Sequence, residues 1–394
     1  MKHKNRVAVT GVGCISALGE NLDECLENMF ASRQHIHAPV RFSTTHPVKY
    51  PVFEITKTFR KPESKKNEDL TLSAQMGIAA TYQALSDAGY GAESFQGKRV
   101  GVCMGTTVGS SLNNEVFYRE YREGKHPDLA PIKRFLNSNP CASIAREFDL
   151  NGPIQTIMNA CASSTDAIGI GASWIKAGIC DLVIAGGTDE LCRVTYNGFI
   201  SLMITDHEPC KPFDAGRNGL NLGEGAAVLI LESEDKLKQT PKCFFSGYGS
   251  ACDAYHSTAP KPDGCGLKKA ITIALKSSDL SPSDIGFINA HGTGTIENDK
   301  VENLIIGEVM PHTPFFSTKG YTGHTLGAAG AIEAVFTIAH LNENKIPKSL
   351  GFAKGDSGAK VFPVKASKEL SCKAAMSESV AFGGNNSVLI FSKN

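Results

Sequence analysis

Residues 153–178 read PIQTIMNACASSTDAIGIGASWIKAG, and this stretch decides the expected fold class. Its apolar start predicts a buried strand, its small residues predict a tight turn, and the spacing after Cys161 predicts a helix. A helix that begins there points free backbone N–H groups at Cys161, which lowers a thiol pKa and favours a nucleophilic thiolate. The alternative is an inert buried cysteine, because Cys141 has the same Cys-Ala-Ser context.

The same succession of strand, small residues and helix recurs along the chain. This alternation predicts an α/β protein with buried sheets. Strands are expected within residues 6–13, 99–107, 153–160, 181–189, 226–233, 244–250, 285–294 and 387–392. Apolar spacings of three and four predict helices over residues 70–88, 164–177, 268–275 and 327–342.

A polar connector, KLKQTPK at residues 236–242, separates two strand-like runs. We therefore predict two halves, residues 1–238 and 239–394. The runs FFSGYGS and INAHGTGT after the connector loosely echo TGVG and AGGTDE before it, which indicates that the halves are similar.

Composition excludes several classes of protein. Of the 394 residues, 41% are hydrophobic, and forty basic residues balance forty acidic ones, which gives no reason to expect a nucleic-acid partner. The N-terminal apolar run is too short for a signal peptide or membrane span, so we expect a cytoplasmic protein without membrane contact. The twelve cysteines show no CxxC pair, so neither a metal site nor disulfides are expected, and no phosphate-binding loop occurs.

Two histidines follow apolar runs and lie in glycine-threonine loops. His291 lies in INAHGTGTIENDKVE, and His324 lies in FFSTKGYTGHTLGAAGAIEA with Lys319 just before it. Neutral imidazoles that donate N–H bonds stabilise an enolate or oxyanion, and a nearby lysine fixes their protonation state. A purely structural hydrogen-bonding role is the alternative for each histidine alone.

A third glycine-rich turn, VAFGGNNSVLIF, places Phe382 before Gly383 and Gly384. Backbone N–H groups of such a turn complete an oxyanion hole, whereas the alternative is a plain β-turn.

Five separated motifs together resemble the elongating, Cys-His-His type of β-ketoacyl synthase. They are NACASS, PFDAGRNGLNLGEGAA, AHGTGT, STKGYTGHTLGAAGAIEA and AFGGNNS, and they span nearly the whole chain in the family's order. The resemblance implies the thiolase fold, in which two duplicated βαβαβαββ halves form α-β-α-β-α layers with the active site between them. It also implies a dimer.

The resemblance assigns a role to each motif residue. Cys161 is similar to the acyl-carrying nucleophile, and His291 and His324 to the pair that promotes malonyl decarboxylation. Lys319 and Glu333 resemble the groups that support the two histidines. The N–H groups of Cys161 and Phe382 would hold the thioester oxygen, Phe382 would gate the acyl pocket, and the remaining substrate contacts are expected from Thr293, Thr295 and Gly383.

The implied reaction is a ping-pong decarboxylative condensation with malonyl-acyl carrier protein. No metal or bound cofactor is expected, because the carrier protein brings its own phosphopantetheine. Carrier proteins of this family are acidic, so a local basic patch is expected near the entrance. By position in the family pattern, its candidates are Lys65, Lys66, Lys133, Arg134 and Lys211, each of which is otherwise an ordinary surface side chain.

The chain departs from the family where SESVAFGGNN replaces NSFGFGGTN. Val380 and Ala381 take the places of an aromatic residue and a glycine, so we expect the gating loop to be stiffer or differently shaped. We therefore also expect a specialised polyketide or polyene substrate. Pocket depth is expected to depend on Met203, Ile200 and the region of Tyr196.

Other condensing-enzyme readings fit the sequence less well. A thiolase needs a second cysteine in the C-terminal glycine turn, and an initiating synthase keeps asparagine at the place of His324. A chain-length factor lacks the nucleophile, although a heterodimer with such a subunit stays open. A cysteine hydrolase or a non-elongating acyl-transfer relative is the remaining alternative.

Overall fold

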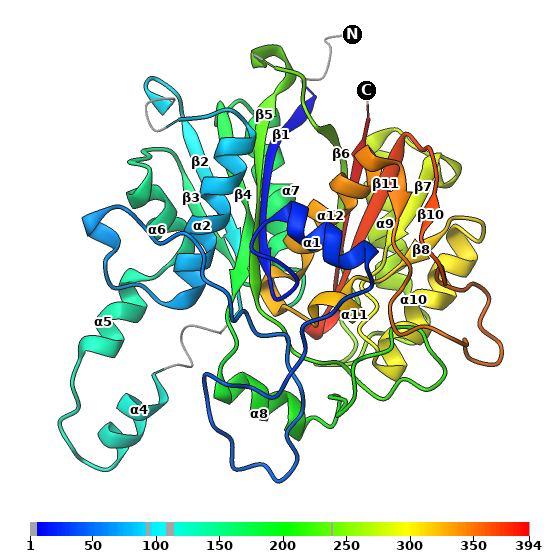
Figure 1. The fold of residues 1–394 in the computed structure, drawn as a ribbon. Helices are drawn as coiled ribbons and strands as arrows, with labels where there is room; N and C mark the ends of the chain where they lie inside the picture. The colour runs from blue at the N-terminus through cyan, green and yellow to red at the C-terminus, as the bar shows by residue number, and fades with distance from the viewer. Residues whose placement is uncertain (1–5, 92–94, 108–113, 238, 394) are drawn as a thin grey trace.

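The computed structural model describes residues 6–91, 95–107, 114–237 and 239–393, and its elements run twice through the same order (Figure 1). The first run comprises β1 (Val7–Ser16), α2 (Leu72–Asp87), β2 (Val100–Gly105), α6 (Pro140–Glu147), β3 (Ile154–Ile157), α7 (Ser163–Lys176), β4 (Leu182–Asp189) and β5 (Gly225–Ser233). The second comprises β6 (Cys243–Cys252), α9 (Cys265–Ser278), β7 (Ile285–Asn289), α10 (Ile296–Val309), β8 (Phe315–Phe316), α12 (Ala329–Glu343), β11 (Ala374–Ala381) and β12 (Asn385–Ser392).

The strands form one ten-stranded sheet in the order β3-β2-β4-β5-β1-β6-β12-β11-β7-β8. Read outward from the centre, the two halves have the same strand order. They join where Val7, Ala8 and Val9 of β1 pair antiparallel with Phe245, Phe244 and Cys243 of β6. The repeated topology confirms the duplicated βαβαβαββ arrangement expected from the resemblance.

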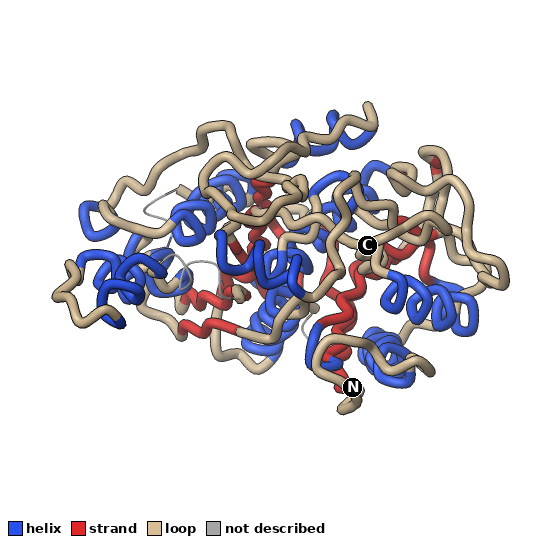
Figure 2. Tube along the Cα trace, turned by 90° about the horizontal axis from the view of Figure 1, so that it is seen from below, coloured by secondary structure: helices blue, strands red, loops and turns tan. Residues whose placement is uncertain are grey.

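Helices cover both faces of each half-sheet, as Figure 2 shows from below. Helix α2 packs on β1 and β5, and α9 packs on β6 and β12. Helices α7 and α12 contact each other, and α12 contacts both β5 and β11, so this pair fills the middle layer. The α-β-α-β-α order expected from the resemblance is therefore confirmed.

Small residues allow the two central helices to approach closely. A Cβ atom on Gly330 of α12 would lie 1.9 Å from Oγ1 of Thr165 on α7, so only glycine fits there. The backbone N–H of Ala331 also donates to Oγ of Ser164 at 2.9 Å. This contact fixes the segment that carries Cys161 against the helix that carries Glu333.

The remaining elements lie around this duplicated core. They are α1 (Leu22–Phe30), α4 (Glu115–Arg122), α5 (Ala130–Asn137), α8 (Arg193–Ser201), α11 (Lys319–Thr322), β9 (Lys345–Ile346), β10 (Lys368–Glu369) and the 3₁₀ turns η1 (Lys65–Asn67), η3 (Glu234–Lys236), η4 (Pro282–Asp284), η5 (Leu326–Ala328) and η6 (Phe382–Gly384). Helices α4 and α5 bury none of their residues and project from the body of the molecule (Figure 1).

Most sequence-based expectations for single elements are confirmed. The four expected helices correspond to α2, α7, α9 and α12, with ends that differ by up to three residues. The expected connector lies between β5 and β6, and its residue 238 lies outside the described residues. All twelve cysteines are free, and nine of them are buried. Within the described part of the chain, no helix is both long and apolar enough to cross a membrane.

Candidate active site

Cys161 lies in the tight turn between β3 and α7. Ala160 takes a left-handed backbone conformation with φ of 47°, which is uncommon outside glycine and turns the chain sharply. The turn is held because the Asn159 N–H donates to Oγ of Ser163 at 2.8 Å, and that hydroxyl donates to the Ala160 carbonyl at 2.6 Å. The Cys161 thiol therefore faces a cavity, although the residue is only 6% exposed.

The expected lowering of the Cys161 pKa is wrong in this structure. Burial raises the pKa of the thiol to about 11, because a thiolate loses its hydration in this enclosed site. The charge of Lys319 and the backbone N–H of Phe382 act in the opposite direction but do not outweigh burial. With a pKa of about 11, the resting group at neutral pH is the thiol.

His291 follows β7, and two carboxylates of α10 hold its loop. The N–H groups of His291 and Gly292 each donate to Glu302 at 2.7 Å, and the Thr293 N–H donates to Asp299 at 3.0 Å. Both acids are almost fully buried. Sequence reasoning missed them, although two acids three residues apart directly after a glycine-threonine loop were the available signal.

His324 follows the short helix α11, and Gly323 lies between them. The φ of Gly323 is 65°, a conformation that favours glycine. Its backbone N–H donates to the Asn221 carbonyl at 2.8 Å, and the Gly223 N–H donates to the His324 carbonyl at 2.9 Å. The Leu326 N–H donates to Nδ1 of the ring at 3.1 Å. The proton of a neutral His324 ring is therefore on Nε2.

The structure brings the two histidines and the cysteine together. One ring nitrogen of each histidine and the Cys161 Sγ atom all lie within 4.8 Å of one another. The rings of His291 and His324 meet edge to face with centroids 5.1 Å apart. Burial, followed by the charge of Lys319, lowers the pKa of both imidazoles well below 6.5, so both are neutral at neutral pH.

Lys319 and Glu333 form a buried ion pair behind His291. The Lys319 ammonium donates to a Glu333 carboxylate oxygen and to the His291 carbonyl at 2.6 Å. It also lies 3.0 Å from Nδ1 of His291, which therefore accepts and keeps its proton on Nε2. Burial raises the pKa of Glu333 to about 7, with Lys319 acting against that shift.

Phe382 begins the 3₁₀ turn after β11 and covers one side of the cavity. Its backbone N–H lies beside the Cys161 thiol, and its ring stacks on Phe199 with centroids 5.7 Å apart. Gly383 does not line the cavity, so its expected substrate contact finds no support, and its N–H donates to the Ser257 carbonyl at 2.8 Å. Ala381 has φ of −118° and ψ of 156°, so alanine causes no backbone strain in this conformation.

A cavity of about 350 Å³ connects these groups to the surface. Thr293 and Thr295 line it, and their hydroxyls lie 2.8 Å apart. Met203 also lines it and is 88% exposed, which places this side chain at the mouth. Ile200 and Tyr196 do not line it and pack instead in a separate apolar cluster, so the expectation that they set pocket depth finds no support.

The basic residues expected to bind a carrier protein are dispersed. Lys65 and Lys66 lie on η1, Lys133 and Arg134 lie on α5, and Lys211 follows α8. None of them lines the cavity that contains Cys161.

A buried cysteine beside two neutral imidazoles, set in a duplicated α/β fold, defines a condensing acyltransferase of the thiolase fold. The family model "Beta-ketoacyl synthase, N-terminal domain" matches residues 4–236, and "Beta-ketoacyl synthase, C-terminal domain" matches residues 243–353. The chain belongs to the β-ketoacyl synthase family.

Three similar proteins illustrate this membership. The "3-oxoacyl-[acyl-carrier-protein] synthase 2" of Synechocystis sp. is 32% identical, over 99% of this chain and 98% of the relative. The solved structure "The ishigamide ketosynthase/chain length factor" has a TM-score of 0.91 and 28% identity, over 99% of this chain and 100% of that one. A type II polyketide synthase acyl-carrier protein in complex with its ketosynthase (AntDE:AntF) has a TM-score of 0.89 and 26% identity, over 100% of both chains.

Proposed function

We propose that this chain transfers an acyl group from an acyl carrier protein to Cys161 and condenses it with malonyl-acyl carrier protein. The observation that carries this proposal is the approach of Cys161 Sγ and both imidazoles to within 4.8 Å, with both rings neutral and protonated on Nε2. One nucleophile and two fixed N–H donors are the groups that the condensation needs.

In the first step, the sulfur of Cys161 attacks the carrier thioester. The new C–S bond forms as the old one breaks, and the thiol proton passes to the departing pantetheine sulfur. Negative charge that develops on the thioester oxygen is stabilised by the N–H groups of Cys161 and Phe382, both of which lie beside the sulfur.

In the second step, malonyl-carrier protein loses carbon dioxide, and its thioester becomes an enolate. The Nε2–H groups of His291 and His324 stabilise the enolate oxygen, and their low pKa keeps each ring a hydrogen-bond donor rather than an acid. The enolate carbon then forms a C–C bond to the acyl carbon, the C–S bond to Cys161 breaks, and the thiolate takes a proton from water.

The proposal needs no resident metal or organic cofactor, because the phosphopantetheine arm arrives with the substrate. Thr293 and Thr295 line the channel and offer hydroxyls to that arm. The absence of a cofactor and the cytoplasmic location both stay predictions.

The experiment follows carbon dioxide release from malonyl-carrier protein. We expect His291→Ala and His324→Ala to lower the rate by about a hundredfold, because each removes a donor to the enolate. His340→Leu is the matched control, since this buried histidine packs edge to face on Phe30 and Phe316 and does not line the site. Equal rates in all variants would refute the assignment of the two histidines.

We further propose that the chain works as a dimer, with a second subunit that is identical or similar to a chain-length factor. Edge strand β3 and the projecting helices α4 and α5 support this, because large apolar side chains on them or directly next to them are exposed. They are Val116, Tyr118, Tyr121, Leu129, Leu136, Ile154 and Met158, with exposed fractions between 48% and 68%. Native mass spectrometry of the purified chain, with Tyr118→Glu and Met158→Glu as interface variants, distinguishes a homodimer from a monomer that needs another subunit.

The expected specialised substrate remains a proposal. Its support is the replacement of the family's aromatic residue and glycine by Val380 and Ala381, both of which line the cavity next to Phe382. A panel of acyl-carrier proteins of graded length and unsaturation tests this point.

A further inference from the structure

The side chain at position 381 distinguishes this chain directly beside its nucleophile. The family pattern NSFGFGGTN has glycine where this chain has Ala381, immediately before Phe382. Ala381 ends β11 and is only 6% exposed. It packs in one small apolar cluster with Cys161, Ala162 and Ala160. The methyl group of Ala381 therefore fills space near the thiol that a glycine would leave open.

The strand determines the direction of this methyl group. Side chains alternate between the two faces of a strand, so Ser379 and Ala381 of β11 point to the same face. Oγ of Ser379 lies 2.7 Å from Oγ1 of Thr165 on α7, the helix that follows Cys161. Val380 points to the opposite face and packs in the apolar cluster of α9 and α10. Ala381 is thus directed at the segment that carries the nucleophile.

The methyl group also lies beside the place of the thioester oxygen. In the proposed reaction, the N–H groups of Cys161 and Phe382 hold that oxygen. The nitrogen of Phe382 is bonded to the carbonyl carbon of Ala381, so the Cβ atom of Ala381 is necessarily close to this N–H group. A substituent on the acyl carbon next to the thioester carbonyl is equally close to the oxygen, and it would meet this methyl group.

Hydrogen bonds hold the backbone on both sides of Phe382. Ala381 pairs with Asn385 of β12, and the side-chain amide of Asn385 donates to the Phe382 carbonyl at 3.2 Å. The Gly383 N–H donates to the Ser257 carbonyl at 2.8 Å. A bulky acyl group can displace the methyl group only by disturbing these contacts, which makes crowding at this point costly.

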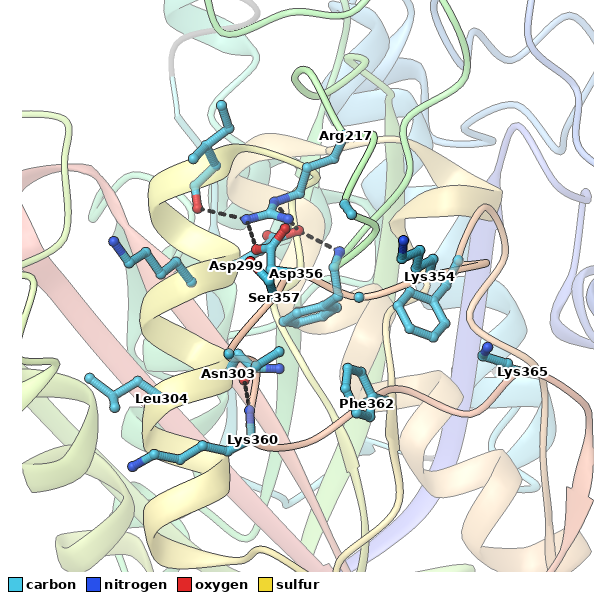
Figure 3. A pocket seen from close by; sticks show the side chains of 18 of the residues that line it. Arg217, Asp299, Asn303, Leu304, Lys354, Asp356, Ser357, Lys360, Phe362 and Lys365 are labelled. Atoms are coloured by element: carbon cyan, nitrogen blue, oxygen red, sulfur yellow. Dashed lines mark hydrogen bonds and ion pairs between the residues drawn. The ribbon is translucent and has the colours of Figure 1, made fainter.

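A neighbouring cavity does not relieve the crowding. It has a volume of about 1150 Å³ and lies between α10 and the segment 352–365 (Figure 3). Neither Cys161 nor Ala381 lines it. The guanidinium of Arg217 donates to the carbonyls of Thr295 at 3.4 Å and Ile296 at 3.2 Å and so closes the boundary between the two cavities. A branch on the acyl group must therefore fit beside Ala381.

We propose that Ala381 makes the site selective for acyl groups that are unbranched at the carbon next to the thioester, because its methyl group occupies the place that an α-methyl substituent would take. This inference rests on the proposed function and names the class of acyl group that Cys161 accepts. A single methyl or methylene group in a closed pocket changes the preference between substrates by about tenfold to about 200-fold.

The test compares hexanoyl-pantetheine with racemic 2-methylhexanoyl-pantetheine, which differ only in the α-methyl group. Intact mass spectrometry gives the rate of Cys161 acylation by each thioester, and the same pair with N-acetylcysteine gives the intrinsic ratio of reactivity. We expect the wild-type ratio of hexanoyl to 2-methylhexanoyl rates to exceed the intrinsic ratio by at least about tenfold. In Ala381→Gly, this ratio should fall by about tenfold.

Two control variants separate the methyl group from other effects. Ala381→Ser keeps a side chain of similar size and should keep the wild-type ratio, whereas backbone flexibility alone would act only in the glycine variant. Val380→Ala removes volume from the same cavity but on the other face of β11, and it should also keep the ratio. Because each ratio compares two acyl groups on one variant, a general loss of stability cancels.

A wild-type ratio equal to the intrinsic one, or a wild-type ratio in Ala381→Gly, would overturn the inference. If both acyl groups load onto Cys161 at the intrinsic ratio, the proposed acyl transfer stands and only the selectivity fails. If neither thioester acylates Cys161, the proposed function fails and this inference fails with it. A fall of the ratio in Val380→Ala as large as that in Ala381→Gly would show that cavity volume decides, and not the methyl group of Ala381.

Discussion

The ammonium of Lys319 lies 3.0 Å from Nδ1 of His291, and it donates at the same time to the backbone carbonyl of that residue. One buried cation thus fixes the position of the ring and the place of its proton. Glu333 balances the charge of Lys319 in an interior where an isolated ammonium would be costly. The supporting pair therefore contributes to stability and to catalysis in ways that experiments can separate.

We predict that Lys319→Met lowers the free energy of unfolding by about 3–5 kcal/mol, because it leaves the Glu333 carboxylate buried without its partner. The double variant Lys319→Met with Glu333→Gln should recover most of that loss and remain inactive, since Nδ1 of His291 still lacks its donor. Urea unfolding and condensation rates measure the two effects. Recovery of activity in the double variant would contradict the role given to Lys319.

We predict that decarboxylation of malonyl-carrier protein keeps its rate as pH falls from about 8 to about 6. Burial and Lys319 lower the pKa of His291 and His324 well below 6.5, so neither ring gains a proton in that interval. Loss of activity on the acid side should begin only below this range. Because the pKa of Glu333 is about 7, the profile is repeated with Glu333→Gln, and a midpoint near 6.5 that persists in this variant would show that at least one ring titrates normally.

We predict that alkylation of Cys161 by iodoacetamide accelerates about tenfold per pH unit between about pH 7 and pH 9 without levelling off. The pKa of the thiol is raised to about 11 by burial, so the reactive thiolate fraction grows throughout that interval. Peptide mass spectrometry separates Cys161 from the exposed Cys252 and Cys265. A plateau by about pH 8 would mean that the lysine and backbone N–H groups outweigh burial.

We predict that Gly383→Ala destabilises the protein by about 1–2 kcal/mol, because a left-handed backbone disfavours a side chain. Its φ is 82°, and an added Cβ would lie 3.0 Å from Nδ2 of Asn385. Acylation of Cys161 should slow as well, since the neighbouring N–H of Phe382 moves. Ala381→Gly is the comparison at an extended position and should cost only about 0.5–1 kcal/mol. Equal costs in the two variants would contradict this account of the turn.

The elements that the sequence predicted correctly have a plain local pattern. The strand before Cys161 and helices α2, α7, α9 and α12 follow from apolar spacing, because their buried faces consist of aliphatic or small residues. Helix α10 was missed, since buried Asn298, Asp299 and Glu302 interrupt its apolar periodicity. Those polar residues are buried because they hold the loop of His291, which is a tertiary effect.

In the candidate active site, too, the sequence predicted the local features and missed those that depend on tertiary contacts. The motifs pointed to Cys161 and the two histidines, and these three side chains do lie close together. They could be found in the sequence because glycine-rich turns at strand ends are local features. The direction of the Cys161 pKa shift could not be predicted, because it depends on the sum of burial over both halves. The ion pairs that engage Lys66, Arg134 and Lys211 also depend on the folded surface and leave no signal in the sequence.

The central claim is that Cys161 carries the acyl chain that malonyl-carrier protein extends, and intact mass spectrometry tests it most directly. After incubation with acyl-carrier protein, the protein should gain one acyl mass, and malonyl-carrier protein should remove it with formation of a β-ketoacyl product two carbons longer. The Cys161→Ala variant should show neither event. Acylation that persists in Cys161→Ala, or release of the acyl group as a free acid without extension, would contradict the account.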